Sequence, residues 1–312
     1  MKVMVLAGGP DREREVSLMS GKEVAAALRE AGHDVIERDL SPSDTAALDE
    51  FAQWCMESPG PGVVFPIFHG KWGEGGGAQK LLDERGVAYV GCREAAARLC
   101  TDKTQTKQAL IEQSLPTPAF ELISCAAGSP GPTLTPPVVV KPNDDGSSID
   151  LAICHDQKAL DTAWAELSSR NDTLLVERFI KGREMTVGVI EDEHGQPLAL
   201  PSIHIVPATE FYDYEAKYIR DDTQYRFDTS PELESRLGEL AVDVFCTLGC
   251  RHLSRVDVFV DERDQPWVIE VNTLPGFTTH SLLPMAAARV GLPMPALVDR
   301  LVQRAATEPP TV

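Results

Sequence analysis

The residues of this chain that could do the most chemistry lie in one stretch, 255–277, where two apolar runs flank a polar turn at 262–265. Period-two alternation on both sides of a turn is typical of a β-hairpin. In the first run, the valines at alternate positions should share one face of the sheet. Strict alternation in the second run predicts two opposite faces, one with Trp267, Ile269 and Val271 and the other with Val268, Glu270 and Asn272.

Four polar residues of this hairpin should gather on one face. If the turn is limited to 262–265, Asp257 lies opposite Glu270, and by the same count Arg255 lies opposite Asn272. Two opposed carboxylates repel each other, and a hard divalent cation with oxygen ligands would remove that repulsion. The spacing therefore predicts a magnesium site made by Asp257, Glu270 and Asn272. The alternative is a solvated hairpin face without a ligand, and a one-residue slip in register would separate the three groups.

The composition argues against several classes of function. The 312 residues include 29 basic and 48 acidic ones, a net charge of −19 that opposes binding to nucleic acid or to anionic lipid. An anionic substrate would therefore need a local basic pocket. The seven cysteines are scattered without a CxxC pair, which favours buried free thiols in a reducing cytoplasm. The N-terminus lacks the features of a signal peptide, and no apolar run is long enough to span a membrane.

The first part of the chain alternates strands with helices, which predicts a parallel sheet of the α/β class. The expected strands cover 2–7, 35–40 and 62–68, and the expected helices cover 16–30 and 44–56. Ligands bind beyond the carboxyl ends of such strands, where glycine-containing loops are expected at 8–17 and 69–79. Either loop alone is equally consistent with an ordinary connection.

From residue 137 the pattern changes to strands, beginning with an apolar run that ends at Lys141. A buried ammonium needs a partner, and the polar turn 143–149 behind it offers backbone N–H groups to a phosphate. The polar and aromatic stretch 209–225 favours a lid or binding element over a disordered insertion. The tail 307–312 is expected to fray. Further strands are expected at 151–153, 173–180 and 184–190, and helices at 102–114, 156–168, 231–248, 281–288 and 295–305.

Four groups of motifs make the chain resemble the D-alanine–D-alanine ligases of the ATP-grasp superfamily over nearly its whole length. They are EREVS at 13–17, HG with GE at 69–74, FYDYEAKY at 211–218, and the hairpin stretch followed by THSL at 279–282. The resemblance implies an ATP-grasp fold of mixed α/β and α+β class, in three parts around a nucleotide cleft. They are an N-terminal parallel-sheet (preATP-grasp) domain for substrate at 1–95, a central α+β lobe at 96–182, and a C-terminal α+β lobe at 183–312 with a lid loop at 208–225 and the metal-binding hairpin.

The same resemblance implies the reaction. Enzymes of this family use ATP to join two D-alanine molecules through an acyl phosphate of the first, and the product D-alanyl-D-alanine is a peptidoglycan precursor. Two Mg²⁺ (or Mn²⁺) ions would be held by Asp257, Glu270 and Asn272, in agreement with the hairpin argument. The resemblance also implies a homodimer.

The family's nucleotide-binding positions can be transferred to this sequence residue by residue. The phosphate-binding positions are Lys103, Lys141 and Lys217. The adenine and ribose positions are Glu177, Phe179, Ile180 and Glu184.

The family's substrate positions can be transferred in the same way. The set that positions the first substrate and eases loss of the amine proton is Glu13, Ser147 and Tyr218. Arg255 and the N–H group of Gly276 would stabilise the oxyanion of the tetrahedral intermediate. Ser281 and Leu282 would hold the second carboxylate, and His69 would lie near the acyl phosphate.

Some positions depart from the family pattern. Asp145 and Asp150 stand where glutamate and glycine are usual, and the added charge of Asp150 should repel a triphosphate unless it points elsewhere. Gly75 stands where an acid or amide is common. These departures leave open a ligase for another D-amino acid, for example D-alanine–D-serine, and a nucleotide-binding relative without catalysis. Tyr218 favours an amine over D-lactate as the nucleophile.

Overall fold

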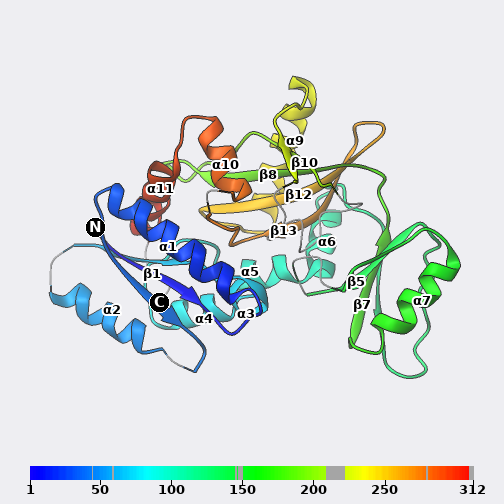
Figure 1. Cartoon of the computed structure of the whole chain (residues 1–312), viewed down its shortest axis with the longest axis horizontal. Coiled ribbons are helices and arrows are strands. Elements are labelled where there is room, and N and C mark those ends of the chain that lie inside the picture. The colour runs from blue at the N-terminus through cyan, green and yellow to red at the C-terminus, as the bar shows by residue number, and fades with distance from the viewer. Residues whose placement is uncertain are drawn as a thin grey trace.

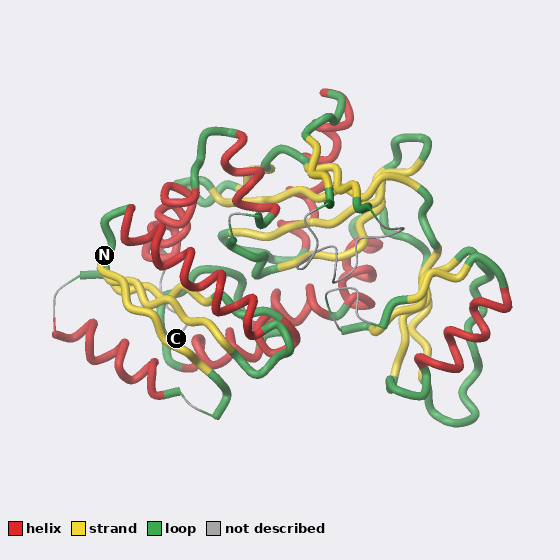
Figure 2. Tube along the Cα trace, viewed as in Figure 1, coloured by secondary structure: helices red, strands yellow, loops and turns green. Residues whose placement is uncertain are grey.

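Three sheets organise the part of the chain that the computed structural model describes, residues 1–43, 45–57, 60–144, 146, 150–208, 222–278 and 280–308 (Figure 1). A three-stranded sheet belongs to the N-terminal region, a four-stranded sheet to the centre and a six-stranded sheet to the C-terminal region. Figure 2 shows the three-stranded and four-stranded sheets at opposite ends of the molecule, with the six-stranded sheet between them.

The N-terminal sheet is parallel, which confirms the prediction from alternating strands and helices. Because β1 is the middle strand, its side chains point alternately to the two faces of the sheet and pack in two different cores. Val3 and Val5 pack in the core that holds α1 and the C-terminal helix α11, and Met4 and Leu6 pack in the core that holds α2. The elements are β1 (Lys2–Gly8), α1 (Arg14–Glu30), β2 (Asp34–Leu40), α2 (Ala46–Glu57), β3 (Gly62–Pro66) and α11 (Met294–Thr307), with strand order β2-β1-β3.

The glycine-rich stretch after β3 is helical, so the prediction of one long loop at 69–79 was wrong. It forms α3 (Gly70–Glu74) and α4 (Gly77–Glu84), and Gly76 between them has a φ of 94° that other residues rarely adopt. A side chain at Gly73 would meet Phe68, so the glycines here permit close packing. Two more helices follow, α5 (Glu94–Thr101) and α6 (Lys103–Glu112), and the expected domain boundary at 95/96 falls inside α5.

The central sheet is antiparallel and small. Its strands are β4 (Phe120–Ser124), β5 (Val138–Pro142), β6 (Ala152–Cys154) and β7 (Thr173–Arg178), in the order β4-β7-β5-β6. Helix α7 (Gln157–Leu167) packs its apolar side on this sheet and begins after Asp156, whose carboxylate accepts a hydrogen bond from the Ala159 N–H. The sheet therefore has one covered face and leaves the other face beside a cavity that β5 and β7 help to line.

The C-terminal sheet carries the predicted hairpin in the order β11-β10-β8-β12-β13, with β9 paired to β8. Helix α9 packs on one face of this sheet and α10 contacts β8 from the other side. The elements are β8 (Gly182–Glu191), β9 (Pro197–Ala199), β10 (Ile203–Val206), β11 (Gln224–Arg226), α9 (Pro231–Thr247), β12 (Leu253–Asp261), β13 (Pro266–Asn272) and α10 (Leu282–Arg289).

The hairpin β12–β13 has a different register at its tip from the one predicted. Val260 pairs with Pro266, one residue out of step, and a β-bulge between Asp257 and Val258 then leaves Ile269 without a partner. The bulge cancels the slip, so Asp257 pairs with Glu270 as predicted. It also corrects the predicted faces of β13, because Val268 and Val271 are both buried while Trp267 pairs with Phe259 on the same side as Glu270.

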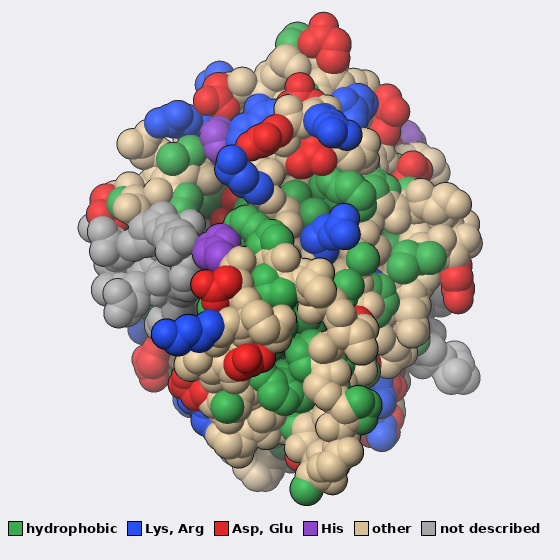
Figure 3. All heavy atoms as spheres, turned by 90° about the vertical axis from the view of Figure 1, so that its right-hand side faces the viewer, with side chains coloured by type: hydrophobic (Ala, Val, Ile, Leu, Met, Phe, Trp, Pro, Cys, Tyr) green, Lys and Arg blue, Asp and Glu red, His purple; other side chains and the backbone are tan. Residues whose placement is uncertain are grey.

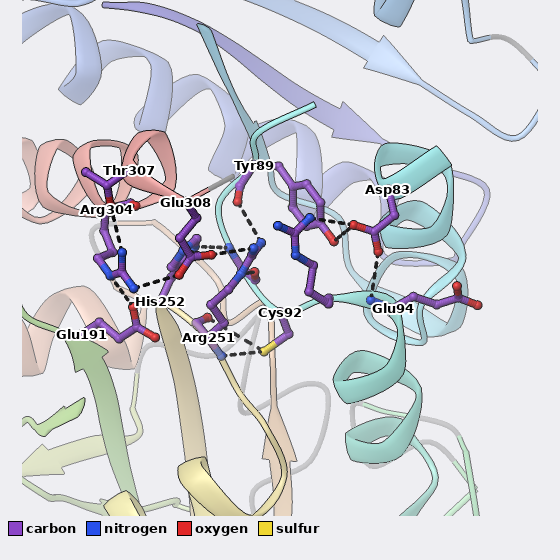
Figure 4. A network of polar contacts seen from close by, with 12 residues as sticks. Asp83, Tyr89, Cys92, Glu94, Glu191, Arg251, His252, Arg304, Thr307 and Glu308 are labelled. Atoms are coloured by element: carbon purple, nitrogen blue, oxygen red, sulfur yellow. Dashed lines mark hydrogen bonds and ion pairs between the residues drawn. The ribbon is translucent and has the colours of Figure 1, made fainter. Parts of the chain in front are cut away.

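A cluster of buried and partly buried charged residues joins the C-terminal end of α11 to the region of residues 89–91, and we call it the junction network: Glu191, Arg251, His252, Arg304 and Glu308 (Figure 4). Glu308 accepts from Arg251 Nη1 and Arg304 Nη2, both at 2.8 Å, and Arg304 Nε donates to Glu191 at 2.7 Å. Arg251 also donates to the backbone of the N-terminal region, at the carbonyls of residues 89 and 91. The expectation of a frayed tail was therefore wrong at residues 307 and 308.

The structure also bears on the expected lid, the cysteines, membrane-spanning segments and the surface charge. Of the expected lid 208–225, residues 209–221 lie outside the described residues, and the end of the stretch enters β11. All seven cysteines are free, and Cys246 is exposed rather than buried. No described helix is both long and apolar enough to cross a membrane. On the face seen in Figure 3, acidic and basic side chains are interspersed among the described residues without a continuous basic stripe.

Candidate active site

The hairpin places the three predicted metal ligands on one face of the C-terminal sheet. Asp257 pairs with Glu270, and Asn272 lies one pair further on, opposite Arg255. The Arg255 guanidinium binds Asp257 with both Nε (2.9 Å) and Nη2 (2.8 Å), and Thr186 Oγ1 donates to the same carboxylate at 2.5 Å. Two carboxylates and an amide oxygen are the donors that Mg²⁺ prefers, so the residues present fit such an ion.

A first cavity begins at this hairpin face and runs between the C-terminal and central sheets. It contains most of the residues expected to bind nucleotide, and Lys103 Nζ lies 3.7 Å from Glu270 Oε2 at the end formed by the hairpin. The residues expected to bind nucleotide or metal that line it are Lys103, Lys141, Glu177, Phe179, Ile180, Glu184, Asp257 and Glu270.

Glu177 is the most buried carboxylate of this cavity, with an exposed fraction of 3%. It lies between two ammonium groups, with Lys141 Nζ at 2.5 Å and Lys107 Nζ at 2.7 Å. Burial would raise the pKa of Glu177, but the charges and hydrogen bonds of Lys107 and Lys141 lower it to about 2. Lys141 thus has the partner that its position at the end of an apolar strand requires.

Lys107 was not assigned to the site from the sequence, and the structure brings it there. Its side chain is fully buried, and burial lowers the pKa of its ammonium. The only sequence signal for it was its place four residues after Lys103, on the same side of α6.

A second, larger cavity of about 700 Å³ meets the first at the hairpin. Residues from the N-terminal region and from the C-terminal lobe face each other across it. The predicted substrate-side residues that line it are Glu13, His69, Arg255, Gly276, Ser281 and Leu282, and Lys103, Glu270 and Asn272 also line it. A side chain at Gly276 would come within 2.9 Å of Ser281 Oγ, so glycine leaves that backbone accessible.

His69 lies in the wall of the larger cavity with 4% of its surface exposed. Its Nδ1 is 3.3 Å from Glu74 Oε1, and its Nε2 has no hydrogen-bond partner among the described residues. Burial raises the pKa of the Glu74 carboxyl, against the opposing contact with His69. Glu74 was quoted only as part of a motif, and its contact with His69 could not be inferred without the turn of α3.

Three predicted residues, Ser147, Lys217 and Tyr218, lie outside the described residues, as does Asp145. Asp150 is described, with a φ of 54°, a left-handed conformation at a position where the family pattern has glycine. Its carboxylate lies 3.3 Å from Arg170 Nη1, at the far end of α7. The extra negative charge is therefore directed to a guanidinium.

Comparison with known proteins agrees with this geometry. A family model described as "D-ala D-ala ligase C-terminus" matches residues 129–303. The chain is 40% identical to a D-alanine–D-alanine ligase of Marinobacter nauticus over 97% of this chain and 90% of that one. It is 42% identical to D-alanine–D-alanine ligase B of Chromobacterium violaceum over 93% of each chain.

Solved structures give the same result. The D-alanine–D-alanine ligase of Bacillus anthracis complexed with ATP superposes with a TM-score of 0.80 and 27% identity, covering 98% of this chain and 97% of that one. The VanG D-Ala:D-Ser ligase of Enterococcus faecalis also reaches a TM-score of 0.80, with 25% identity over 97% of this chain and 99% of that one. The chain therefore belongs to the D-alanine–D-alanine ligase family and has its ATP-grasp fold.

Proposed function

We propose that this chain is an ATP-dependent ligase that joins two molecules of D-alanine into D-alanyl-D-alanine for peptidoglycan synthesis. The observation that carries the proposal is the meeting of two cavities at the hairpin β12–β13. One is lined by lysines and the expected nucleotide-binding residues, and the other by Glu13, His69 and Arg255. A phosphoryl group and a carboxylate can react only where two such sites adjoin.

The nucleotide end would use the lysines to bind the phosphates, since Lys103 and Lys141 both line the smaller cavity. Lys217 joins them by family resemblance. Phe179, Ile180 and Glu184 would enclose the adenine and ribose beside Glu177. Asp257, Glu270 and Asn272 would hold two Mg²⁺ (or Mn²⁺) ions, which supply neutralisation of the triphosphate charge.

The substrate end would hold the first D-alanine so that its carboxylate reaches the γ-phosphate. Glu13 binds its ammonium, with Ser147 and Tyr218 assigned beside it by resemblance, and His69 faces the acyl phosphate that forms. The amine of the second D-alanine then attacks the acyl carbon, and phosphate leaves. Arg255 and the Gly276 N–H would stabilise the oxyanion of that step.

The second D-alanine would be held by its carboxylate at Ser281 and Leu282, at the start of α10. Helix N-termini favour anions, because their first N–H groups are free. The family resemblance also supports a cytoplasmic homodimer, a lid at 208–225, and three parts at 1–95, 96–182 and 183–312, and we include these in the proposal.

The proposal is tested with the purified protein, D-alanine, ATP and Mg²⁺. We expect phosphate and dipeptide to appear in equal amounts, measured by a phosphate assay and by mass spectrometry. A protein that binds ATP but releases neither product at any pH between 6 and 10 would overturn it.

A second candidate is a ligase that prefers D-serine in the second site. It is favoured by the structural match to a D-Ala:D-Ser ligase and by the unusual Gly75 and Asp150. Competition between D-alanine and D-serine as second substrate, read by mass spectrometry of the dipeptides, decides between the two.

A further inference from the structure

Beneath the nucleotide cavity, a buried chain of polar contacts connects the central lobe with the hairpin. It begins at Glu177 on β7, which binds Lys107 Nζ at 2.7 Å. Lys107 Nζ also donates to Thr117 Oγ1 at 2.8 Å, and that hydroxyl donates to the carbonyl of Val268 on β13 at 2.8 Å. The exposed fractions are 0% for Lys107, 8% for Thr117 and 3% for Glu177, so all three side chains of this series of contacts are buried.

The contact on Val268 is made at a sensitive point of the fold. Val268 is the last residue of β13 in the shifted register, directly before the unpaired Ile269 of the bulge. Both of its backbone polar groups bind the segment after α6, because its N–H donates to the carbonyl of Pro116 at 2.9 Å. This segment therefore fixes β13 on the side away from β12, at the residue where the register changes.

The bulge determines where the proposed metal ligands lie. Without the bulge, the register of the hairpin tip would continue along both strands, and Asp257 would pair with Ile269 instead of Glu270. A one-residue slip also turns side chains to the opposite face of a sheet. Whatever holds Val268 in place thus holds Glu270 in place.

The other end of the polar chain determines where Glu177 lies. Its carboxylate is shared between Lys107 and Lys141, which come from α6 and β5. Lys107 has a second hydrogen bond, to Thr117, that restricts the position of its ammonium. Lys107 and Thr117 therefore connect two ends of the cavity. Lys107 contacts Glu177 at the end proposed for the adenine base (the base end), and Thr117 contacts β13 at the end proposed for the metal (the metal end).

We propose that Lys107 and Thr117 are positioning residues that keep the base end and the metal end of the nucleotide cavity in one geometry. This inference rests on the proposed function, which assigns nucleotide to the cavity. Neither side chain needs to touch the nucleotide. Thr117 acts through the bulge of β13, and Lys107 acts through Glu177 and through Thr117.

The test uses binding of ADP to the full-length protein by isothermal titration calorimetry, with Mg²⁺ and with EDTA. Thr117→Val removes the hydroxyl and keeps the shape of the side chain, so it should raise the Kd of ADP about tenfold in Mg²⁺ and less than about twofold in EDTA. Thr117→Ser restores the hydroxyl and should return the Kd to within about threefold of the wild type.

The matched control is Thr106→Val on α6, the helix that carries Lys107. Thr106 is 1% exposed and its hydroxyl also donates to a backbone carbonyl, at 2.7 Å, but it lies outside the polar chain. We expect a similar fall in Tm for Thr106→Val and Thr117→Val, and a change in Kd for the second only. A Thr117→Val protein that binds Mg²⁺–ADP as well as the Thr106→Val protein would overturn the inference.

Lys107→Met tests the other end of the polar chain. It also provides an independent test of the inference if Thr117→Val does not fold. Because Glu177 then keeps only Lys141, ADP should bind about tenfold more weakly both in Mg²⁺ and in EDTA, and wild-type affinity would overturn the inference. Dipeptide formation by the wild type is measured in parallel. If the proposed function fails, neither the wild type nor any variant forms the dipeptide. If only this inference fails, the variants bind ADP with an unchanged Kd.

Discussion

Two buried histidines of this protein make a useful comparison, because each binds through Nδ1 and leaves Nε2 without a hydrogen bond among the described residues. His252 Nδ1 accepts from the Gly91 N–H at 3.1 Å, so its neutral ring carries the proton on Nε2, 3.4 Å from Glu308. His69 Nδ1 lies 3.3 Å from Glu74 Oε1, and the His69 side chain lines the large cavity.

The surroundings of the two rings explain the difference in role. Around His252 the carboxylates of the junction network are bound by Arg251 and Arg304, and the charges are balanced within the protein. The His69 side chain, in contrast, is part of the wall of a cavity that is large enough for a substrate. A buried histidine is therefore a better sign of a binding site when its side chain lines a cavity than when packed protein surrounds it.

Among the residues that line the large cavity, we expect substitution of Glu270 to reduce activity the most. Glu270→Gln keeps the size of the side chain but removes the charge of a proposed metal ligand, and we expect kcat/KM to fall about 10³-fold with little change in Tm. The control is Glu262→Gln in the same hairpin, an exposed residue that pairs with Lys181. Steady-state kinetics and thermal unfolding of both variants decide the point, and a Glu270→Gln enzyme with the wild-type rate would refute the metal assignment.

A matched pair of substitutions sharpens the contrast between the histidines themselves. Asparagine keeps a polar group at the Nδ1 position and deletes Nε2 in both. We expect His69→Asn to lower kcat/KM about 10²-fold with an unchanged Tm, because the proposed function places His69 beside the acyl phosphate. His252→Asn should leave the rate within about twofold and lower the free energy of unfolding by about 1–2 kcal/mol, because it leaves a small void in packed protein.

The converse result would reverse the two assignments. Asparagine tolerates the left-handed backbone of His252, whose φ is 66°, so strain does not confuse the stability measurement. Denaturant unfolding and steady-state kinetics on the same preparations provide both numbers.

The smallest effect concerns pH and the junction network. Burial would raise the pKa of Glu308, but His252, Arg251 and Arg304 lower it to about 2, below the value in an unfolded chain. Ionised Glu308 therefore stabilises the fold above about pH 4.5, and this stabilisation disappears as the pH falls toward 2. Partial solvent screening reduces it to about 2 kcal/mol.

We expect Glu308→Gln to lower the free energy of unfolding by that amount at pH 7 and by much less at pH 3, with an unchanged rate of ligation at pH 7. Urea titrations at the two pH values measure the difference, and Glu193→Gln, whose side chain is exposed, is the control. An equal loss at both pH values would show that the charge of Glu308 is not the cause.

The sequence predicted the parts of the fold that depend on local periodicity. The parallel sheet and most helices follow from it. The facing pair Asp257 and Glu270 was predicted correctly, but only because the bulge offsets the slip in register at the tip of the hairpin. The family resemblance added the substrate-side residues, and the structure brings Glu13, His69 and Ser281 to one cavity.

Features that depend on distant segments were not predictable in this way. The bulge of β13 is bound by Pro116 and Thr117, which lie about 150 residues earlier in the chain. The partner of Lys107 lies on another strand, and Glu308 is bound by a residue 57 positions away. Strands β4 and β10 were missed because they have only five and four residues, too few for an alternating pattern to stand out from the flanking sequence.

The bulge also separates two tasks within one hairpin. The slip in register is absorbed at Ile269, so the pairs Asp257–Glu270 and Arg255–Asn272 lie on the other side of the bulge from the tip around residues 261–265. The tip is therefore a natural place for engineering. A short peptide tag or a fluorescent label could be grafted there, and loops of other lengths tolerated, without moving the carboxylates.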